Sequence, residues 1–248
     1  MKHYLFSRFV VGVLTLCGCV VTTLAFGEDN PTQEPKRRFT AAEIMKRAHD
    51  VRAKWNDFSG FKADVAVFSG SNRVDGTVVV SAEGKVSLQI SDPELGKWAT
   101  EDLQSLVDHR FPAESHEYDV AFVKGERPNA LGRLIRFNDD RLHSVYRVRY
   151  NVITEVHRTM GNRKLIINIV DVQRNKEKKI LPRTYTVSWV DVKTGKVSSM
   201  QVVNNRWVRI GKIDLPSRVL KVVHKEDGTR QVREIRLSNH ELLTAETD

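Results

Sequence analysis

The hydrophobic pattern from residue 40 onward begins with a helix. Thr40-Ala41-Ala42-Glu43 matches a capping box, in which the threonine hydroxyl and the glutamate carboxylate satisfy free backbone N–H groups at a helix start. Apolar residues then recur every three or four positions and predict a helix with one apolar stripe, ending near Asn56: Ile44, Ala48, Val51 and Trp55. Such a stripe needs a sheet or another helix to cover.

A second helical pattern starts at Pro93, a residue that favours the first turn of a helix. Its apolar residues keep helical spacing to about Arg110, and Phe111-Pro112 ends it. These residues are Trp98, Leu103, Leu106 and Val107.

The remaining segments alternate apolar and polar residues, the period of strands with one buried face. Three predicted strands precede the second helix: residues 61–68, 74–81 and 85–90. Nine follow it: residues 118–124, 132–138, 142–158, 164–173, 181–191, 196–204, 207–213, 217–225 and 229–237. Turn residues separate them, among them Gly161-Asn162, Asn204-Asn205 and Asp227-Gly228.

No strand–helix–strand crossover recurs, so a parallel sheet is not expected. The pattern predicts an α+β fold with one domain over residues 40–243: a strongly curved antiparallel sheet, or open half-barrel, with the two helices on its concave side. Large apolar residues alternate along its long strands, including Val156, Leu165, Ile167, Ile169 and Val187. If the helices cover the concave face only in part, a cavity of lipid size results; if they fill it, the same residues form an ordinary core.

The first 27 residues have the pattern of an export signal. Lys2 and Arg8 precede an uncharged stretch from Phe9 to Phe26, and Ala25 and Gly27 are small residues at the positions that a signal peptidase reads. We therefore expect cleavage after Gly27, a disordered lead-in over residues 28–39, and a secreted, periplasmic or cell-envelope location. A membrane anchor and a lipoprotein with lipidated Cys19 are the alternatives.

Cleavage after Gly27 removes both cysteines, Cys17 and Cys19, so no disulfide would stabilise the exported domain. It leaves 38 basic against 31 acidic residues. This excess favours anionic partners, such as an anionic membrane surface. The basic residues are scattered along the strands, however, as on any solvated sheet face, and few aromatic residues lie among them, so no nucleic-acid partner is expected.

Candidate chemistry is sparse, and the chain is more consistent with a binding protein than with an enzyme. No Gly-x-Ser-x-Gly motif occurs. His116-Glu117 and His240-Glu241 lack the second histidine of a zinc-binding helix. A metal-dependent hydrolase with His109 and His116 as ligands stays a third alternative. We expect no cofactor, no metal and no catalytic residues.

Candidate ligand-binding residues are the large apolar and aromatic side chains expected at the cavity and at the second helix, which two prolines delimit as a lid. They are Trp55, Phe58, Phe61, Trp98, Leu103, Leu106, Tyr185, Trp189 and Trp207. Basic residues near this lid could meet an anionic head group at the rim: Lys97, Arg110, Lys124 and Arg127.

Two short tracts resemble the DUF3386 family of uncharacterised bacterial proteins. They are Arg47-Ala48-His49-Asp50 with Trp55, Phe58 and Gly60-Phe61, and residues 236–243 (RLSNHELL). This resemblance implies no known activity. The order of elements is also similar to the LolA/LolB superfamily of envelope carriers, whose members form an open half-barrel with an apolar cavity for lipids or the acyl chains of lipoproteins. That resemblance is one of architecture alone.

Two functions of different classes follow. The first is a non-enzymatic extracytoplasmic carrier for an apolar or amphipathic ligand, with a lipid or lipidated peptide as its partner. The alternative is a structural or interaction domain of the cell envelope that presents a sheet edge or a basic face and has no cavity.

Overall fold

The computed structural model describes residues 39–112, 118–127 and 129–244, and these residues group into one compact unit that starts at Phe39. Its first element is α1 (Ala41–Asp50). Thr40 caps this helix as predicted: its Oγ1 accepts from the Glu43 N–H at 3.1 Å, and its own N–H donates to Glu43 Oε2 at 2.9 Å. The predicted signal segment and most of the lead-in lie outside the described residues.

The first helix ends six residues earlier than the pattern predicts. Beyond Val51 the chain turns toward the sheet, where the Ala53 N–H donates to Ile180 O at 2.9 Å and the Ile180 N–H donates to Val51 O at 2.7 Å. Trp55 therefore lies in the extended segment after the helix, not on its last turn. The helix buries Ala41, Met45 and Ala48, so its buried stripe is rotated from the predicted one.

The sheet contains twelve strands, and all of their pairings are antiparallel. Three precede the second helix: β1 (Phe61–Ser69), β2 (Asn72–Val80) and β3 (Val86–Ile90). The helix α2 (Pro93–Asp108) follows, with Asp92 as its N-cap. The other strands are β4 (Val120–Phe122), β5 (Arg133–Phe137), β6 (Val145–Arg149), β7 (Val152–Met160), β8 (Arg163–Arg174), β9 (Ile180–Asp191), β10 (Val197–Ile210), β11 (Ile213–Lys225) and β12 (Arg230–Leu242).

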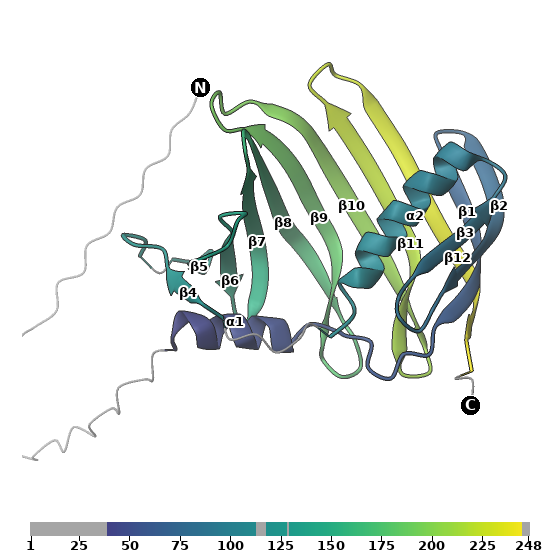
Figure 1. The fold of residues 1–248 in the computed structure, drawn as a ribbon, viewed down its shortest axis with the longest axis horizontal. Coiled ribbons are helices and arrows are strands. Elements are labelled where there is room, and N and C mark those ends of the chain that lie inside the picture. Colours follow the sequence, from purple (N-terminus) through teal and green to yellow (C-terminus); the bar gives the residue numbers. More distant parts are fainter. Residues whose placement is uncertain (1–38, 113–117, 128, 245–248) are drawn as a thin grey trace, which may run out of the picture. The chain divides into compact units, whose positions relative to one another are not determined.

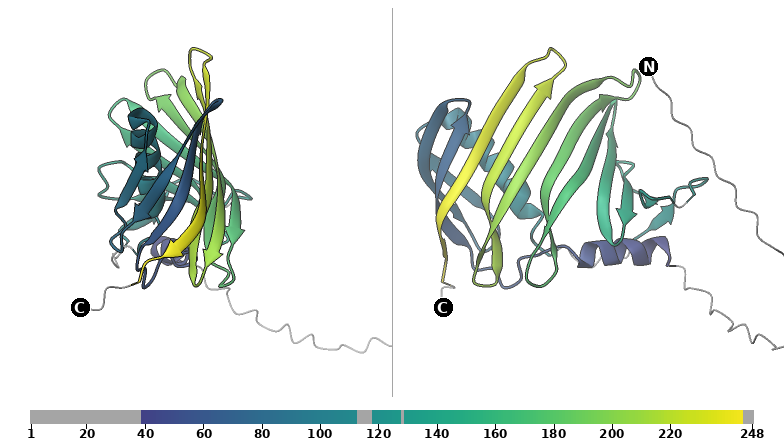
Figure 2. Two further views of the ribbon diagram at one scale, coloured as in Figure 1. Left: turned by 90° about the vertical axis from the view of Figure 1, so that its right-hand side faces the viewer. Right: turned by 180° about the vertical axis from the view of Figure 1, so that it is seen from behind.

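The strand order is β3-β2-β1-β12-β11-β10-β9-β8-β7-β6-β5-β4. Each strand from β4 to β12 thus pairs with its neighbour in sequence, and β12 pairs with β1. The sheet that the described strands form is not closed, because β3 and β4 stand at its two ends. Figures 1 and 2 show this single sheet from three directions.

Several strand ends differ from the predicted ranges by a few residues, and the division into strands differs at two places. Residues 142–158 form two strands, because Tyr150 and Asn151 both adopt positive φ (49° and 60°) and reverse the chain between β6 and β7. In contrast, Asn204-Asn205 is not a turn: both residues lie inside β10. Their side-chain amides donate to β9, Asn204 to Thr184 Oγ1 at 2.9 Å and Asn205 to Pro182 O at 3.4 Å.

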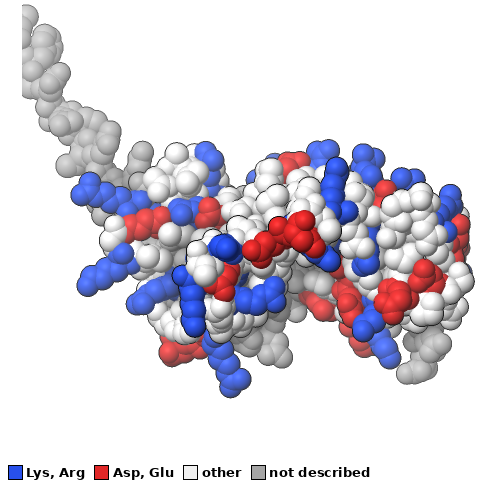
Figure 3. All heavy atoms as spheres, turned by 90° about the horizontal axis from the view of Figure 1, so that it is seen from above, with Lys and Arg blue, Asp and Glu red and all other residues white. Residues whose placement is uncertain are grey.

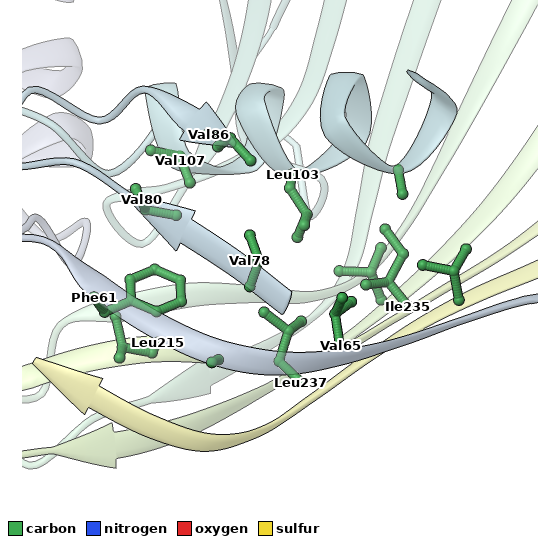
Figure 4. Close-up of a cluster of buried hydrophobic side chains, with 14 of the residues drawn as sticks. Phe61, Val65, Val78, Val80, Val86, Leu103, Val107, Leu215, Ile235 and Leu237 are labelled. Atoms are coloured by element: carbon green, nitrogen blue, oxygen red, sulfur yellow. The ribbon is translucent and has the colours of Figure 1, made fainter. Parts of the chain in front are cut away.

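The largest buried cluster joins α2 to β1, β2, β3 and β10–β12. Figure 4 shows Leu103 and Val107 of α2 above Val65, Val78 and other strand residues. A second cluster joins α1 to β5 and β6, with Met45, Ile135 and Val148 at 0–3% exposure. Each helix thus packs near a different end of the sheet, and in Figure 1 neither lies over the middle and upper parts of β7 and β8.

Candidate functional site

A row of apolar side chains lies on the face of β7–β9 that also carries α2. Val203 of β10 belongs to the α2 cluster, and it pairs directly with Tyr185, which pairs with Ile169. Directly paired residues point to the same face, and so do residues two positions along each strand. This register assigns six residues to the helix side, the apolar strip: Val156, Leu165, Ile167, Ile169, Val187 and Trp189.

The apolar strip is half-buried throughout, although it lies in the middle of the sheet. None of its six members belongs to the three clusters of buried hydrophobic side chains in the described part of the chain. The opposite face of the same strands is mostly polar, with Glu155, His157, Asn168, Thr186 and Ser188 beside Ile166. The strands are therefore amphipathic, with the apolar side toward the helices.

An open depression of about 510 Å³ continues the apolar strip across β10 and β11. Its Ser199 and Gln201 pair with Trp189 and Val187 of the strip. The other lining residues are Arg163, Ser198, Val223, Lys225, Glu226 and Asp227. A second depression of about 270 Å³ lies near the N-terminal end of α1 and is lined in part by Ile44, Val148 and Tyr150.

Arg110 follows α2 and is only 3% exposed. Its Nη1 donates to Ala53 O at 3.2 Å, and its guanidinium carbon lies 5.5 Å from the centre of the Trp207 ring. Its Nε is buried and has no hydrogen-bond partner among the described residues. Burial, with the charge of Arg52 as a second cause, lowers the pKa of Arg110 to about 9.

Arg52 and Arg158 lie near Arg110, and we call the three residues the arginine cluster. Arg52 Nη2 donates to His109 O at 3.1 Å. Arg158 Nη2 donates to Tyr146 Oη at 3.1 Å, while the Arg158 Nε is buried without a partner. Desolvation of the ring is the main cause that lowers the pKa of His109, and the hydrogen bond to Ser105 opposes it. The charges of all three arginines lower this pKa further.

Three aromatic residues expected to line the cavity are core residues. Trp55, Phe58 and Phe61 are 1–9% exposed, and the Trp55 and Phe58 rings are stacked at 4.5 Å. Leu103 is buried in the same cluster, with Trp98 and Leu106 packed against it. Trp207 is buried in a small third cluster. Tyr185 and Trp189 alone among the nine predicted residues lie on the β9 side that carries the apolar strip.

The four predicted rim residues do not converge. Lys97 is exposed on α2, and Arg110 is buried, not at a rim. Lys124 and Arg127 are exposed in the segment after β4, an edge strand, whereas α2 contacts β3 at the opposite edge of the sheet. The lid expected at α2 is also firmly packed, since Leu95, Ala99, Leu103 and Val107 are at most 6% exposed.

The described residues contain no group of three or more histidine, cysteine, aspartate or glutamate side chains that could hold a metal ion. His109 Nδ1 instead hydrogen-bonds with Ser105 O at 2.6 Å, one turn earlier in α2. Its proposed metal partner, His116, lies outside the described residues. The described helices also include none with the length and apolar content that crossing a membrane requires.

Charged side chains of both signs are interspersed on the side of the molecule seen in Figure 3. The described residues also form exposed ion pairs, for example Lys62 with Glu241 at 2.9 Å and Arg73 with Asp75 at 2.8 Å. On this side the basic excess of the chain is therefore not gathered into one patch.

Two members of the arginine cluster were missed in the sequence, although each carries a signal. Arg158 follows Val156 by two positions, so it occupies the apolar face of β7 in register. Arg52 follows Ala48 by four positions and so continues the buried stripe of α1 past the end of the helix. A charged residue in an apolar register indicates either that its charge is paired within the protein or that it binds a ligand.

Comparisons with known proteins place the chain in a family. Three solved structures are similar over 84% of this chain: a LolA superfamily protein from Nitrosomonas europaea (13% identity, 95% of that chain, TM-score 0.33), a DUF1329 family protein from Desulfovibrio piger (10%, 94%, 0.29) and an outer membrane lipoprotein-sorting protein domain, described as putative, from Vibrio parahaemolyticus (11%, 94%, 0.31). These low scores carry no functional argument. A search of the curated proteins finds no match. The model of the family described as "Protein of unknown function (DUF3386)" matches residues 36–243, and the chain belongs to this family.

Proposed function

We propose that this protein is a non-enzymatic carrier for an apolar or amphipathic ligand, such as a lipid or a lipidated peptide, and that the apolar strip binds the ligand's apolar part. In this proposal the sheet is a half-barrel, and the face with the helices is its concave side. The extracytoplasmic location rests on the pattern of residues 1–27, which lie outside the described residues.

The observation that carries the proposal is the exposure of the apolar strip. Six apolar residues on three adjacent strands stay half-buried, while the polar residues face the other way. Leaving such a contiguous surface in water is unfavourable by about 25 cal/mol per Å², and proteins keep such patches mainly where something binds. The adjoining depression gives the bound group room beyond the strip.

Binding of a neutral apolar fluorophore, N-phenyl-1-naphthylamine, to the purified protein tests the proposal. Ile167 and Ile166 are adjacent, both half-buried, and point to opposite faces of β8. Ile167→Asn should weaken binding about tenfold or more, because it removes an apolar contact on the strip. Ile166→Asn is the matched control and should change the affinity by less than about twofold.

Fluorescence titration gives both affinities, and thermal melting shows whether each variant folds. If the wild-type protein does not bind the fluorophore saturably, or if both variants weaken binding equally, the carrier proposal is wrong. The interaction-domain alternative, in which the sheet contacts an envelope protein, would then be the better account.

A further inference from the structure

We propose that the arginine cluster of Arg52, Arg110 and Arg158 binds the carboxylate or phosphate head group of an acidic amphiphile. The apolar chain of that amphiphile lies on the apolar strip, so this inference rests on the proposed function and specifies its ligand class.

The argument starts from the unsatisfied guanidinium of Arg110. A buried charge is costly unless it is paired and hydrogen-bonded. Arg110 is 3% exposed, yet only Nη1 of its three guanidinium nitrogens donates to a described residue. The contact with the Trp207 ring stabilises the cation in part, but it supplies no hydrogen-bond acceptor.

Arg110 is also the only fully buried arginine among the described residues. Among the half-buried arginines, Arg147 pairs with Glu126 and Glu155, and Arg218 pairs with Glu234 at 2.5 Å. Arg133 and Arg233 instead lie over the rings of Phe122 and Trp98. No described carboxylate forms an ion pair with Arg52, Arg110 or Arg158. Three like charges within reach of one histidine repel one another, so an anion placed beside them would stabilise the cluster.

Two acidic groups near the cluster, both among the described residues, already have partners. Asp140 is within electrostatic range of Arg158, but its carboxylate accepts from the Leu142 N–H at 3.1 Å and the Ser144 N–H at 2.9 Å. Asp102 of α2 is near Tyr185 and pairs with Lys221 at 2.6 Å. A carboxylate or phosphate from outside therefore fits the cluster, because its oxygens accept several N–H bonds from guanidinium groups at once.

The position of the cluster relative to the apolar strip favours an amphiphile as the source of that anion. Arg158 pairs directly with Leu165 of the strip. Arg110 is close enough to Tyr185 for its charge to oppose the rise in that tyrosine's pKa, and Tyr185 pairs with Ile169 of the strip. Charged donors and a half-buried apolar surface thus adjoin on one face, which is the arrangement that a head group and its chain require.

The test compares cis-parinaric acid with its methyl ester in fluorescence titrations of the whole purified protein, with the wild type, Arg110→Met and the control Arg206→Met. Arg206 is exposed on the opposite face of β10, so its replacement makes the same change of charge away from the site. The wild type should bind the acid more tightly than the ester. Arg110→Met should weaken acid binding about 10- to 100-fold and ester binding by less than about twofold.

Thermal melting separates this role from a structural one. Arg110→Met removes a buried charge without a described carboxylate partner, but it also removes the hydrogen bond to Ala53 O, so the melting temperature of the free protein should change little. A large drop would instead indicate that Arg110 is mainly structural. Should Arg110→Met not fold, Arg158→Met provides the same comparison from β7. Equal affinities of wild type for acid and ester, or an Arg110→Met that weakens both ligands equally, would overturn the anion site while leaving the carrier proposal in place.

Inorganic phosphate distinguishes the two sources of an anion. Phosphate at millimolar concentration should raise the melting temperature of the wild type by much less than the acid does. If phosphate stabilises the wild type but not Arg110→Met, and neither parinaric ligand binds, the cluster holds a free oxyanion. The head-group inference and the carrier proposal would then both be wrong.

Discussion

Trp55 contacts aromatic rings of the core on two sides. Its ring stacks on Phe58 and meets Phe111 edge-on at 6.0 Å, and its Nε1 donates to Asp214 O at 3.0 Å. Trp55→Ala should lower the free energy of unfolding by about 3 to 5 kcal/mol, because it leaves a large cavity and a buried carbonyl without its donor. Urea denaturation measures this change. Trp189→Ala, on the half-buried strip, should cost much less, and equal losses would contradict the assignment of Trp55 to the core.

His49 makes the stability depend on pH. Its ring hydrogen-bonds with the Tyr118 hydroxyl, and burial, with the charges of Arg52 and Lys54, lowers its pKa to about 4. The unfolded chain takes up a proton at about pH 6.5, whereas the folded protein does not until about pH 4. The contribution of neutral His49 to the free energy of unfolding is therefore fully present above pH 6.5 and is lost as the pH drops toward 4.

This loss should amount to about 1 to 2 kcal/mol after solvent screening of the partly exposed ring. His49→Gln keeps a side chain that can hydrogen-bond but does not titrate. Urea denaturation of the variant between pH 7 and 4.5 should show a smaller loss than that of the wild type, whereas His224→Gln, at an exposed position, should leave the loss unchanged. A variant with the wild-type pH dependence would show that His49 is not responsible.

At the residue scale the sequence identified candidate aromatic residues but did not predict which of them are buried under other elements. Trp55 and Trp189 occupy similar apolar registers, yet one is 3% exposed and the other half-buried. The difference arises because Trp55 N donates to Arg110 O at 2.7 Å, which draws the segment after α1 to the end of α2. Contacts between residues so far apart along the chain leave no local signal.

At the element scale the boundaries fail where backbone conformation overrides hydrophobic period. The alternation of apolar and polar residues over 142–158 continues through Tyr150 and Asn151. The pattern therefore gives no sign that the chain reverses at these two residues. Asn204 and Asn205 resemble a turn, but their amides bond to the neighbouring strand. One predicted strand forms two strands, β6 and β7, and two predicted strands form one, β10. The two errors cancel, so the predicted number of strands was still twelve.

The β6–β7 turn can be improved, because both of its central residues have positive φ. A type I′ turn prefers Asn-Gly at these positions, and a bulky residue with positive φ is strained. Tyr150→Asn combined with Asn151→Gly should raise the free energy of unfolding by about 0.5 to 1 kcal/mol, whereas Asn151→Val should lower it by about 1 kcal/mol or more. Urea midpoints measure both. If the segment were a continuous strand, the glycine variant would instead be the destabilised one.

At the scale of the whole molecule the absence of crossover patterns correctly predicted antiparallel pairing over the described strands. The pairing of β12 with β1 follows from no local pattern, because these are the first and last strands along the chain. Nor does the sequence show that α1 and α2 pack near different ends of the sheet. That separation creates the apolar strip, so the candidate site is a property of the tertiary arrangement.

The same separation predicts unequal local stability along the sheet. β1, β11 and β12 share the largest buried cluster with α2, whereas β7 and β8 bury no side chain fully and β9 buries only Ile180 and Leu181 at its start. Amides in strands with little buried apolar contact open more readily. Hydrogen exchange followed by mass spectrometry should therefore be slowest in β1, β11 and β12 and faster in β7–β9. Adding cis-parinaric acid should slow exchange in β7–β9 and leave β1–β3 unchanged, because the ligand covers only the uncovered strands. Protection that rises uniformly, or only in β1–β3, would place the ligand elsewhere than on the apolar strip.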